Sequence, residues 1–182
     1  MKKSLLIFCP FFISAMHCGQ TNMIYNCVRC GNVPGLENAL IQSTREINTP
    51  GEDEEPPLHW AAIIGNTEMV ELLLKNDANP NQLDKDNDTP LHSAAIGGNK
   101  RIAELLIQYG ADTTVNHVDI HGYVALHSAA FHNNTDVIEV LLAHNGKKMI
   151  NHIANNGLTP LKAAIQNENH EAEELLRNNG GL

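Results

Sequence analysis

Aromatic and basic residues are both scarce in this chain of 182 residues. Only 4% of the residues are aromatic, so the core must consist mainly of Leu, Ile, Val and Ala, which suits short packed helices. Lys and Arg number 12 against 21 acidic residues, and the formal net charge is −9. A surface of that sign repels phosphate groups. Nucleic acid and anionic membranes are therefore disfavoured partners, and a protein with a basic, partly apolar surface is favoured.

The N-terminal apolar run is too short to span a bilayer, because a membrane-spanning helix needs about 20 such residues. The run extends from Leu5 to Ala15, follows Lys2 and Lys3, and precedes small or polar residues up to Gly19. This order is typical of an export signal. We predict a signal peptide over residues 1–19 and an exported domain over residues 20–182, periplasmic or secreted and not inserted in a membrane.

Two alternatives to a cleaved signal stay open. The segment could be a buried N-terminal helix or strand. Cys18 could also carry a lipid anchor, although Ala15-Met16-His17 departs from the small residue that usually precedes a lipidated cysteine.

Cysteine occurs only near the N-terminus, at positions 9, 18, 27 and 30. Cys27 and Cys30 form a C-x-x-C pair, a spacing found in redox pairs and in half of a zinc site. No second C-x-x-C pair follows, so we predict no metal and no cofactor. We expect both residues on a capping helix, with Cys27 as a small core residue. Whether they form a disulfide stays open.

Catalytic motifs are missing as well. The chain contains no G-x-S-x-G, no phosphate-binding loop and no H-E-x-x-H. His117 and His121 lie four residues apart, but no helix is predicted there to align them and no carboxylate lies at metal spacing. We predict that the protein is not an enzyme. An enzyme or a metal-dependent protein is the less favoured alternative.

What the chain does contain is an internal repeat. One six-residue block recurs at intervals of 33, 35 and 35 residues: Pro57-Leu58-His59-Trp60-Ala61-Ala62, Pro90-Leu91-His92-Ser93-Ala94-Ala95, Ala125-Leu126-His127-Ser128-Ala129-Ala130 and Pro160-Leu161-Lys162-Ala163-Ala164-Ile165. A leucine pair follows each block: Leu72-Leu73, Leu105-Leu106, Leu141-Leu142 and Leu175-Leu176. Periods of this length indicate a repeat architecture.

The residues of each unit predict a helix, a turn, a second helix and a loop. Thr89 can cap a helix that begins at Pro90, and the Ala pairs allow a second helix to approach closely. Gly98 ends the first helix, and Gly110 ends a second helix over residues 100–109. Polar stretches with turn residues follow at 81–88 and 151–158. Because one helix pair cannot bury its apolar face, the units must stack into a solenoid.

The pattern G-x-T-P-L-H-x-A-A-x-x-G followed by L-L-x-x-G-A-D, best matched from Asp88 to Asp112, resembles the ankyrin repeat. The resemblance implies an all-α fold, an ankyrin-repeat solenoid of stacked antiparallel helix pairs joined by projecting hairpin loops. It covers about residues 48–182, with repeats at about 48–80, 81–113, 114–149 and 150–182 after a degenerate capping repeat at 21–47. The polar second helix of the last repeat predicts a complete array, monomeric until bound.

The third and fourth repeats depart from the pattern. Val124-Ala125 replaces Thr-Pro in the third repeat, Lys162 replaces His in the fourth, and Glu168 replaces Gly there. We expect insertions around residues 113–118 and near Asn134.

The resemblance implies a protein-binding scaffold whose loop tips and first helices form a concave face. The family's binding positions, carried onto this chain, predict these partner-binding residues: Ile63, Ile64, Lys85, Asp86, Asp88, Ile96, Ile120, His121, Tyr123, Phe131 and His132. Two residues follow each repeated Ala-Ala pair, for example Ile63-Ile64. Alternatively, the first of these two residues packs against the neighbouring repeat, and the charged residues of the loops only keep the protein soluble. Trp60 is expected in the core, and the family uses His59, His92 and His127 to tie neighbouring loops by hydrogen bonds.

Two roles stay open for such a binding protein. One is an exported bacterial protein that acts as a periplasmic inhibitor or accessory protein, which the N-terminal segment favours. The other is a secreted effector that engages a host protein. The sequons Asn87-Asp88-Thr89 and Asn133-Asn134-Thr135 also leave a eukaryotic secreted origin open.

Overall fold

Short helices in antiparallel pairs form the part of the chain that the structure describes. The computed structural model describes residues 22–51 and 54–182, so the predicted signal segment, Cys9, Cys18, Glu52 and Asp53 lie outside it. The helices are α1 (Met23–Arg29), α2 (Val33–Gln42), α3 (Pro57–Ile63), α4 (Thr67–Lys75), α5 (Pro90–Gly97), α6 (Lys100–Gln108), α7 (Ala125–Phe131), α8 (Thr135–Ala143), α9 (Pro160–Gln166) and α10 (His170–Asn178), with 3₁₀ turns η2 (Ala111–Thr114) and η3 (Gly146–Met149). Neither range contains a strand, and none of these helices has the length and apolarity that crossing a membrane requires.

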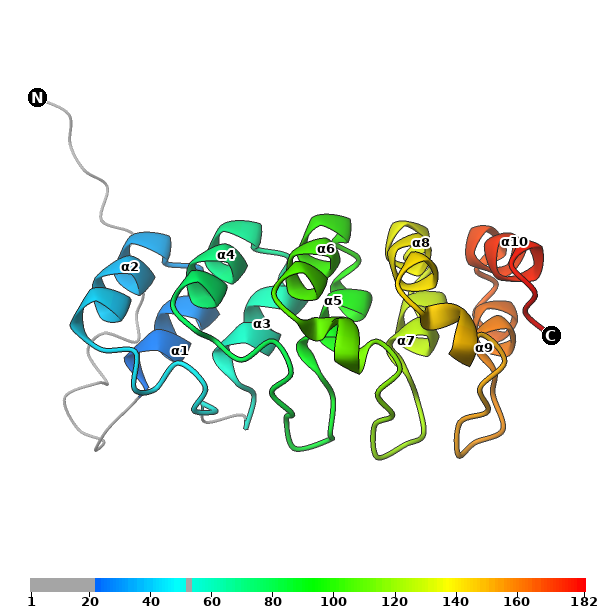
Figure 1. The fold of residues 1–182 in the computed structure, drawn as a ribbon, viewed down its shortest axis with the longest axis horizontal. Coiled ribbons are helices and arrows are strands. Elements are labelled where there is room, and N and C mark those ends of the chain that lie inside the picture. Colours follow the sequence, from blue (N-terminus) through cyan, green and yellow to red (C-terminus); the bar gives the residue numbers. More distant parts are fainter. Residues whose placement is uncertain (1–21, 52–53) are drawn as a thin grey trace, which may run out of the picture.

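The helix pairs stack side by side into a solenoid, as predicted. Helices α2, α4, α6, α8 and α10 form one row, and α1, α3, α5, α7 and α9 form the other (Figure 1). Successive odd helices from α1 to α9 contact one another, and so do successive even helices from α2 to α10. The loops before the odd helices project together from one edge of the array (Figure 1).

Small residues set the distance between neighbouring odd helices. The repeated alanines are fully buried, each with 0% exposure: Ala61, Ala62, Ala94, Ala95, Ala129 and Ala130. At Gly97 a Cβ atom would lie 2.7 Å from the carbonyl oxygens of Ala62 and Ile63, so a side chain at this position would push α5 away from α3. The alanines and Gly97 therefore permit the close stacking on which the array depends.

Asparagine side chains at the starts of the even helices stabilise both the helix and the stack. Asn66 and Asn99 each accept a hydrogen bond from the backbone N–H three residues later, at 3.1 and 3.2 Å. The amide of Asn99 also donates to the carbonyl of Gly65 at 3.2 Å, and that of Asn134 donates to Ala95 at 2.7 Å. The Asn99 side chain thus caps its own helix through its oxygen and joins that helix to the preceding pair through its nitrogen.

The extra residues of the longer repeats form the two 3₁₀ turns. The segment 76–80 between α4 and Asn81 is two residues shorter than the equivalent segments 109–115 and 144–150, which contain η2 and η3. The insertion predicted near Asn134 is wrong, because α8 begins 35 residues after α6 and Asn134 takes the place of Asn99. Leu141 therefore takes the place of Leu106, whereas the pattern of leucine pairs had aligned it with Leu105.

Helix α7 offers a direct test of the capping argument. Thr89 and Thr159 cap α5 and α9 by accepting hydrogen bonds from the backbone N–H three residues on, at 3.4 and 3.2 Å. Val124 holds the same position before α7 and cannot accept one. We expect Val124→Thr to raise the free energy of unfolding by about 1 kcal/mol, and Thr89→Val to lower it by a similar amount. Urea unfolding followed by circular dichroism measures both. A destabilised Val124→Thr would contradict the argument, because the buried hydroxyl would then cost more than its hydrogen bond contributes.

Candidate functional site

Three fully described hairpin turns precede α5, α7 and α9, with the same backbone geometry. In each, the first N–H donates to the fifth carbonyl: Asp84 to Asp88 at 3.1 Å, Asp119 to Tyr123 at 2.9 Å and Ala154 to Leu158 at 2.9 Å. The fourth residue of each has a positive φ, at Asn87, Gly122 and Gly157. The turns therefore present their remaining side chains in the same register.

Aspartate side chains shape the first two turns. Asp84 Oδ1 accepts hydrogen bonds from the backbone N–H groups of Asp86 and Asp88, both at 2.8 Å. Asp119 Oδ1 accepts from His121 and Tyr123 at 2.8 and 2.7 Å. These hydrogen bonds are local to each turn, as expected of aspartate at the start of a turn.

Backbone hydrogen bonds join the turns laterally into one surface. The N–H of Ile120 donates to the carbonyl of Asp86 at 3.1 Å, and the N–H of Asn155 donates to that of His121 at 3.0 Å. At Gly122 a Cβ atom would lie 2.7 Å from the Asn155 nitrogen, so the close approach depends on glycine. We call the surface formed by residues 83–88, 118–123 and 153–158 the loop row.

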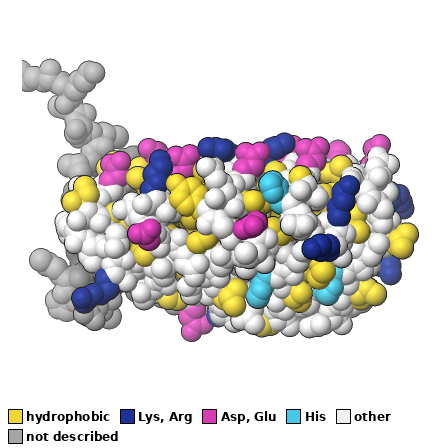
Figure 2. Space-filling view, in the orientation of Figure 1, with side chains coloured by type: hydrophobic (Ala, Val, Ile, Leu, Met, Phe, Trp, Pro, Cys, Tyr) yellow, Lys and Arg dark blue, Asp and Glu magenta, His cyan; other side chains and the backbone are white. Residues whose placement is uncertain are grey.

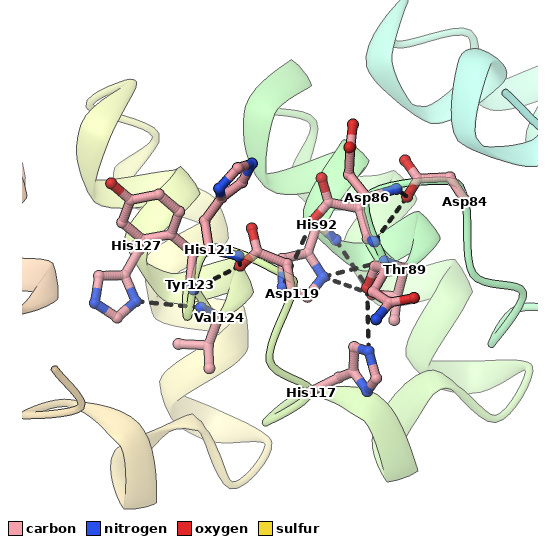
Figure 3. A network of polar contacts seen from close by, with 12 residues as sticks. Asp84, Asp86, Thr89, His92, His117, Asp119, His121, Tyr123, Val124 and His127 are labelled. Carbon is pink, nitrogen blue, oxygen red and sulfur yellow. Dashed lines mark hydrogen bonds and ion pairs between the residues drawn. The ribbon is translucent and has the colours of Figure 1, made fainter. Parts of the chain in front are cut away.

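Histidine side chains anchor the loop row from two directions. His59 Nε2 bonds forward to the carbonyl of Asp88 at 3.0 Å, and His127 Nε2 bonds forward to that of Leu158 at 3.2 Å. His117 Nε2 bonds back to Asn87 at 3.1 Å, and His152 Nε2 bonds back to Gly122 at 3.1 Å. The first two contacts are the loop ties that the resemblance implied. Figure 3 shows His92 and His117 between neighbouring turns.

His92 is buried and neutral. The backbone N–H of Thr89 donates to its Nδ1 at 3.2 Å, so the ring proton is on Nε2. Burial lowers the pKa of His92 to about 3 and that of His127 to about 4. Among the described residues, His92 Nε2 forms no hydrogen bond of good geometry; the backbone of Tyr123 is a weak acceptor for it, and Asp88 Oδ1 lies 3.9 Å away.

The carboxylates of the loop row are not paired with any basic side chain of residues 22–51 and 54–182. Ion pairs join Lys75 to Glu71 at 3.2 Å and Lys100 to Glu139 at 3.4 Å, both on the even helices, where Figure 2 shows mixed acidic and basic side chains along the upper edge. Within the described ranges, no Lys or Arg forms an ion pair with any aspartate of the loop row. In the same ranges, no group of three His, Cys, Asp or Glu side chains is arranged to hold a metal ion.

Burial and the lack of basic partners both affect the pKa of Asp88. Its side chain is 24% exposed. Burial, followed by the negative charges of Asp84, Asp119 and Asp86, raises the pKa of Asp88 to about 7. Near neutral pH this carboxyl group is therefore partly protonated.

The structure separates the predicted binding residues into two groups. The first lies together in the loop row: Lys85, Asp86, Asp88, Ile120, His121 and Tyr123. The second lies at the C-terminal ends of α3, α5 and α7: Ile63, Ile64, Ile96, Phe131 and His132. Since these helices have seven or eight residues, the groups are separated by about 10 Å along the helix axis.

The helix-end group is unevenly exposed. Ile64 is 44% exposed and Phe131 is 50% exposed, whereas Ile63 and Ile96 are half-buried. Trp60 is also half-buried and packs against the core, as expected. Tyr123 is half-buried in the loop row, with its ring centroid 5.3 Å from that of His127 and its hydroxyl oxygen accepting a hydrogen bond from the Asn156 amide.

The predicted set omits a row of exposed apolar residues. Leu83, Val118 and Ile153 each stand one residue before a hairpin turn, 35 residues apart, and are 37%, 37% and 63% exposed. Their signal in the sequence was an apolar residue recurring in register within otherwise polar loops. They add apolar area directly beside the turns.

Comparisons with known proteins agree with the repeat architecture. Residues 11–117 and 113–181 match the family model described as ankyrin repeats in three copies. Sixty residues of the chain are 40% identical to part of the transient receptor potential cation channel subfamily A member 1 homolog of Caenorhabditis elegans. That match covers 33% of this chain and 5% of the channel homolog, so the likeness is confined to a small part of the larger protein.

The raised pKa of Asp88 predicts how stability changes with pH. Because the folded-state pKa lies above the unfolded value, the stability linked to the protonated group is fully present below about pH 4 and is lost as pH rises through 7. We expect Asp88→Asn to raise the free energy of unfolding at pH 8 by about 1–2 kcal/mol, allowing for partial exposure, and to leave it unchanged at pH 4. Urea titrations of both proteins at pH 4, 6 and 8 test this. An equal effect at every pH would assign the change to packing and not to charge.

Proposed function

Because the chain belongs to the ankyrin-repeat family, we propose that it is a non-catalytic module that binds another protein through the loop row and the exposed ends of the odd helices. The observation that carries the proposal is the exposed apolar area on that part of an acidic protein. Ile120 is 48% exposed in the loop row, and Ile153 and Phe131 are exposed to 63% and 50%. Large apolar side chains at such positions are typical of protein-binding surfaces.

Rigidity of the supporting backbone also favours a binding role. The turns are closed internally, joined laterally and anchored by His59, His117, His127 and His152. The backbone of the loop row is therefore ordered before a partner arrives. A surface prepared in this way loses little conformational entropy on binding.

Export is the second part of the proposal. Lys2 and Lys3, the apolar run from Leu5 to Ala15 and the polar residues that follow support a signal peptide over residues 1–19. An exported, acidic binding protein would act as a periplasmic inhibitor or accessory protein. The alternative is a secreted effector that engages a host protein, which the same signal would also serve.

Surface variants test where the partner binds. The full chain and the variant Ile120→Asp, Phe131→Ser, Ile153→Asp would each be used to capture partners from native extract, and the captured protein would be identified and titrated by calorimetry. We expect the triple variant to bind at least tenfold more weakly, because apolar anchors dominate interface energies. The matched control is Ile41→Asp, since Ile41 is 83% exposed on α2, far along the array from these three positions. Binding that survives the triple variant but not the control would place the site elsewhere.

Processing of the N-terminus tests export. We expect the protein recovered outside the cytoplasm to lack residues 1–19, as N-terminal sequencing and intact mass would show. Ile7→Asp with Phe12→Asp should leave the chain unprocessed in the cytoplasm, because charges interrupt the apolar run. A cytoplasmic protein that retains these residues in the parent would contradict the proposal. A lipid-modified Cys18 would instead appear as added mass and partition into detergent.

A further inference from the structure

The charge and the apolar exposure of the loop row change from one end to the other. Its first turn contains Asp84, Asp86 and Asp88 against one Lys85, and its second begins with Asp119. The third turn, residues 154–158, has no charged side chain. The exposed apolar residues show the opposite trend, since Leu83 is 37% exposed and Ile153 is 63% exposed. The surface therefore has an acidic end beside α5 and an apolar end beside α9.

The acidic end contains one basic side chain, Lys85, which does not pair with its carboxylates in the described part of the chain. This side chain is exposed. His92 is neutral and buried next to Asp88; its Nε2 lies 3.9 Å from Asp88 Oδ1 and within reach of the backbone of Tyr123, a weak contact without good hydrogen-bond geometry. Figure 3 shows the two turns and His92 from close by. The titratable and charged groups around Asp88 are Glu55, His59, Asp84, Lys85, Asp86, His92, His117 and Asp119.

We propose that the loop row binds its partner in one orientation, with a lysine or arginine side chain against Asp86, Asp88 and Asp119 and branched apolar side chains against Val118, Ile120 and Ile153. The inference rests on the proposed protein-binding function and specifies its partner. A cation at the acidic end meets three acidic side chains that form no ion pair with a Lys or Arg among the described residues. At the apolar end, apolar side chains of the partner can pack without removing water from a charged group.

The spacing of the turns sets the spacing of the partner's residues. Packed helices lie about 8–10 Å apart, so the acidic and apolar ends are separated by roughly 10–20 Å. In an extended partner segment, at about 3.3 Å per residue, this corresponds to three to six residues between the basic and the apolar side chains. A helical segment, at about 1.5 Å per residue, would need about 7–13.

Binding of the cation is coupled to release of a proton. The basic group pairs with the ionised form of Asp88, and the proton that this carboxyl group carries in part of the free protein passes to solvent. With the pKa of Asp88 at about 7, the ionised fraction rises close to tenfold between pH 6 and pH 8. We therefore expect affinity to rise by up to about tenfold over that range, and the Asp88→Asn variant to lose this dependence.

A random dodecapeptide display library, panned against the full chain at pH 8, is the probe for the test. We expect the enriched peptides to contain Lys or Arg separated from Ile, Val or Leu by about three to six residues if they bind extended, or about 7–13 if they bind as a helix. The basic residue should lie on the same side of the apolar residue, N-terminal or C-terminal, in all of them. Synthetic versions should bind Asp86→Asn and Asp88→Asn about tenfold more weakly. The control Glu174→Gln, on an exposed position of α10, should leave affinity unchanged. The reversed peptide should bind more weakly than the forward one.

The outcomes separate this inference from the function on which it rests. Peptides that lose binding to Ile120→Asp and Ile153→Asp, but contain no basic residue and bind Asp88→Asn normally, would overturn the orientation and leave the binding function standing. Affinity independent of pH in the parent protein would overturn the coupling to Asp88. A library that yields no peptide dependent on the loop row would count against the proposed binding function itself.

Discussion

Every helix in this array is too short to be stable in isolation, and the rest of the structure depends on that constraint. The odd helices have seven or eight residues, whereas an isolated helix is marginal in water below about 12–15. Burial against neighbours must therefore supply the stability. The fully buried alanines between odd helices, together with Gly97, allow the contact, and one apolar cluster extends from Ile24 in α1 to Leu176 in α10. Stability is shared between neighbouring pairs, as in other repeat arrays.

The polar contacts between repeats serve a different purpose from the apolar ones. His59 and His127 bond forward, His117 and His152 bond back, and the turns bond to one another through their backbones. Because these contacts use backbone carbonyls as acceptors, they hold the loops in place whatever side chains the turns display. A loop can change from the acidic residues 84–88 to the uncharged residues 154–158 without losing its shape. This separation lets the surface chemistry vary along a constant scaffold.

Burial lowers the pKa of the histidines of the repeated block and raises the pKa of Asp88. The pKa of His59, of His92 and of His127 is lowered because the charged ring is poorly solvated. The contribution of these neutral rings is present above pH 6.5 and is lost as pH falls. Burial and neighbouring carboxylates raise the pKa of Asp88 instead, so its contribution is lost as pH rises. Stability and surface charge are therefore linked within the same few residues.

Local residue patterns were enough to predict the helix pairs. Thr89-Pro90 and Gly98 mark helix ends by capping and by positive φ, which are properties of neighbouring residues alone, and the structure has those ends where the sequence placed them. The insertion expected near Asn134 was wrong, because the added residues of the longer repeats lie in η2 and η3. The sequence by itself determined the repeat, its helical period and its acidic charge. Only the tertiary structure decided that Leu83, Val118 and Ile153 share one exposed row, and that Asp88 sits between carboxylates of adjacent turns. Those relations join residues about one repeat apart, and their distances arise from the stacking of helices and not from local sequence.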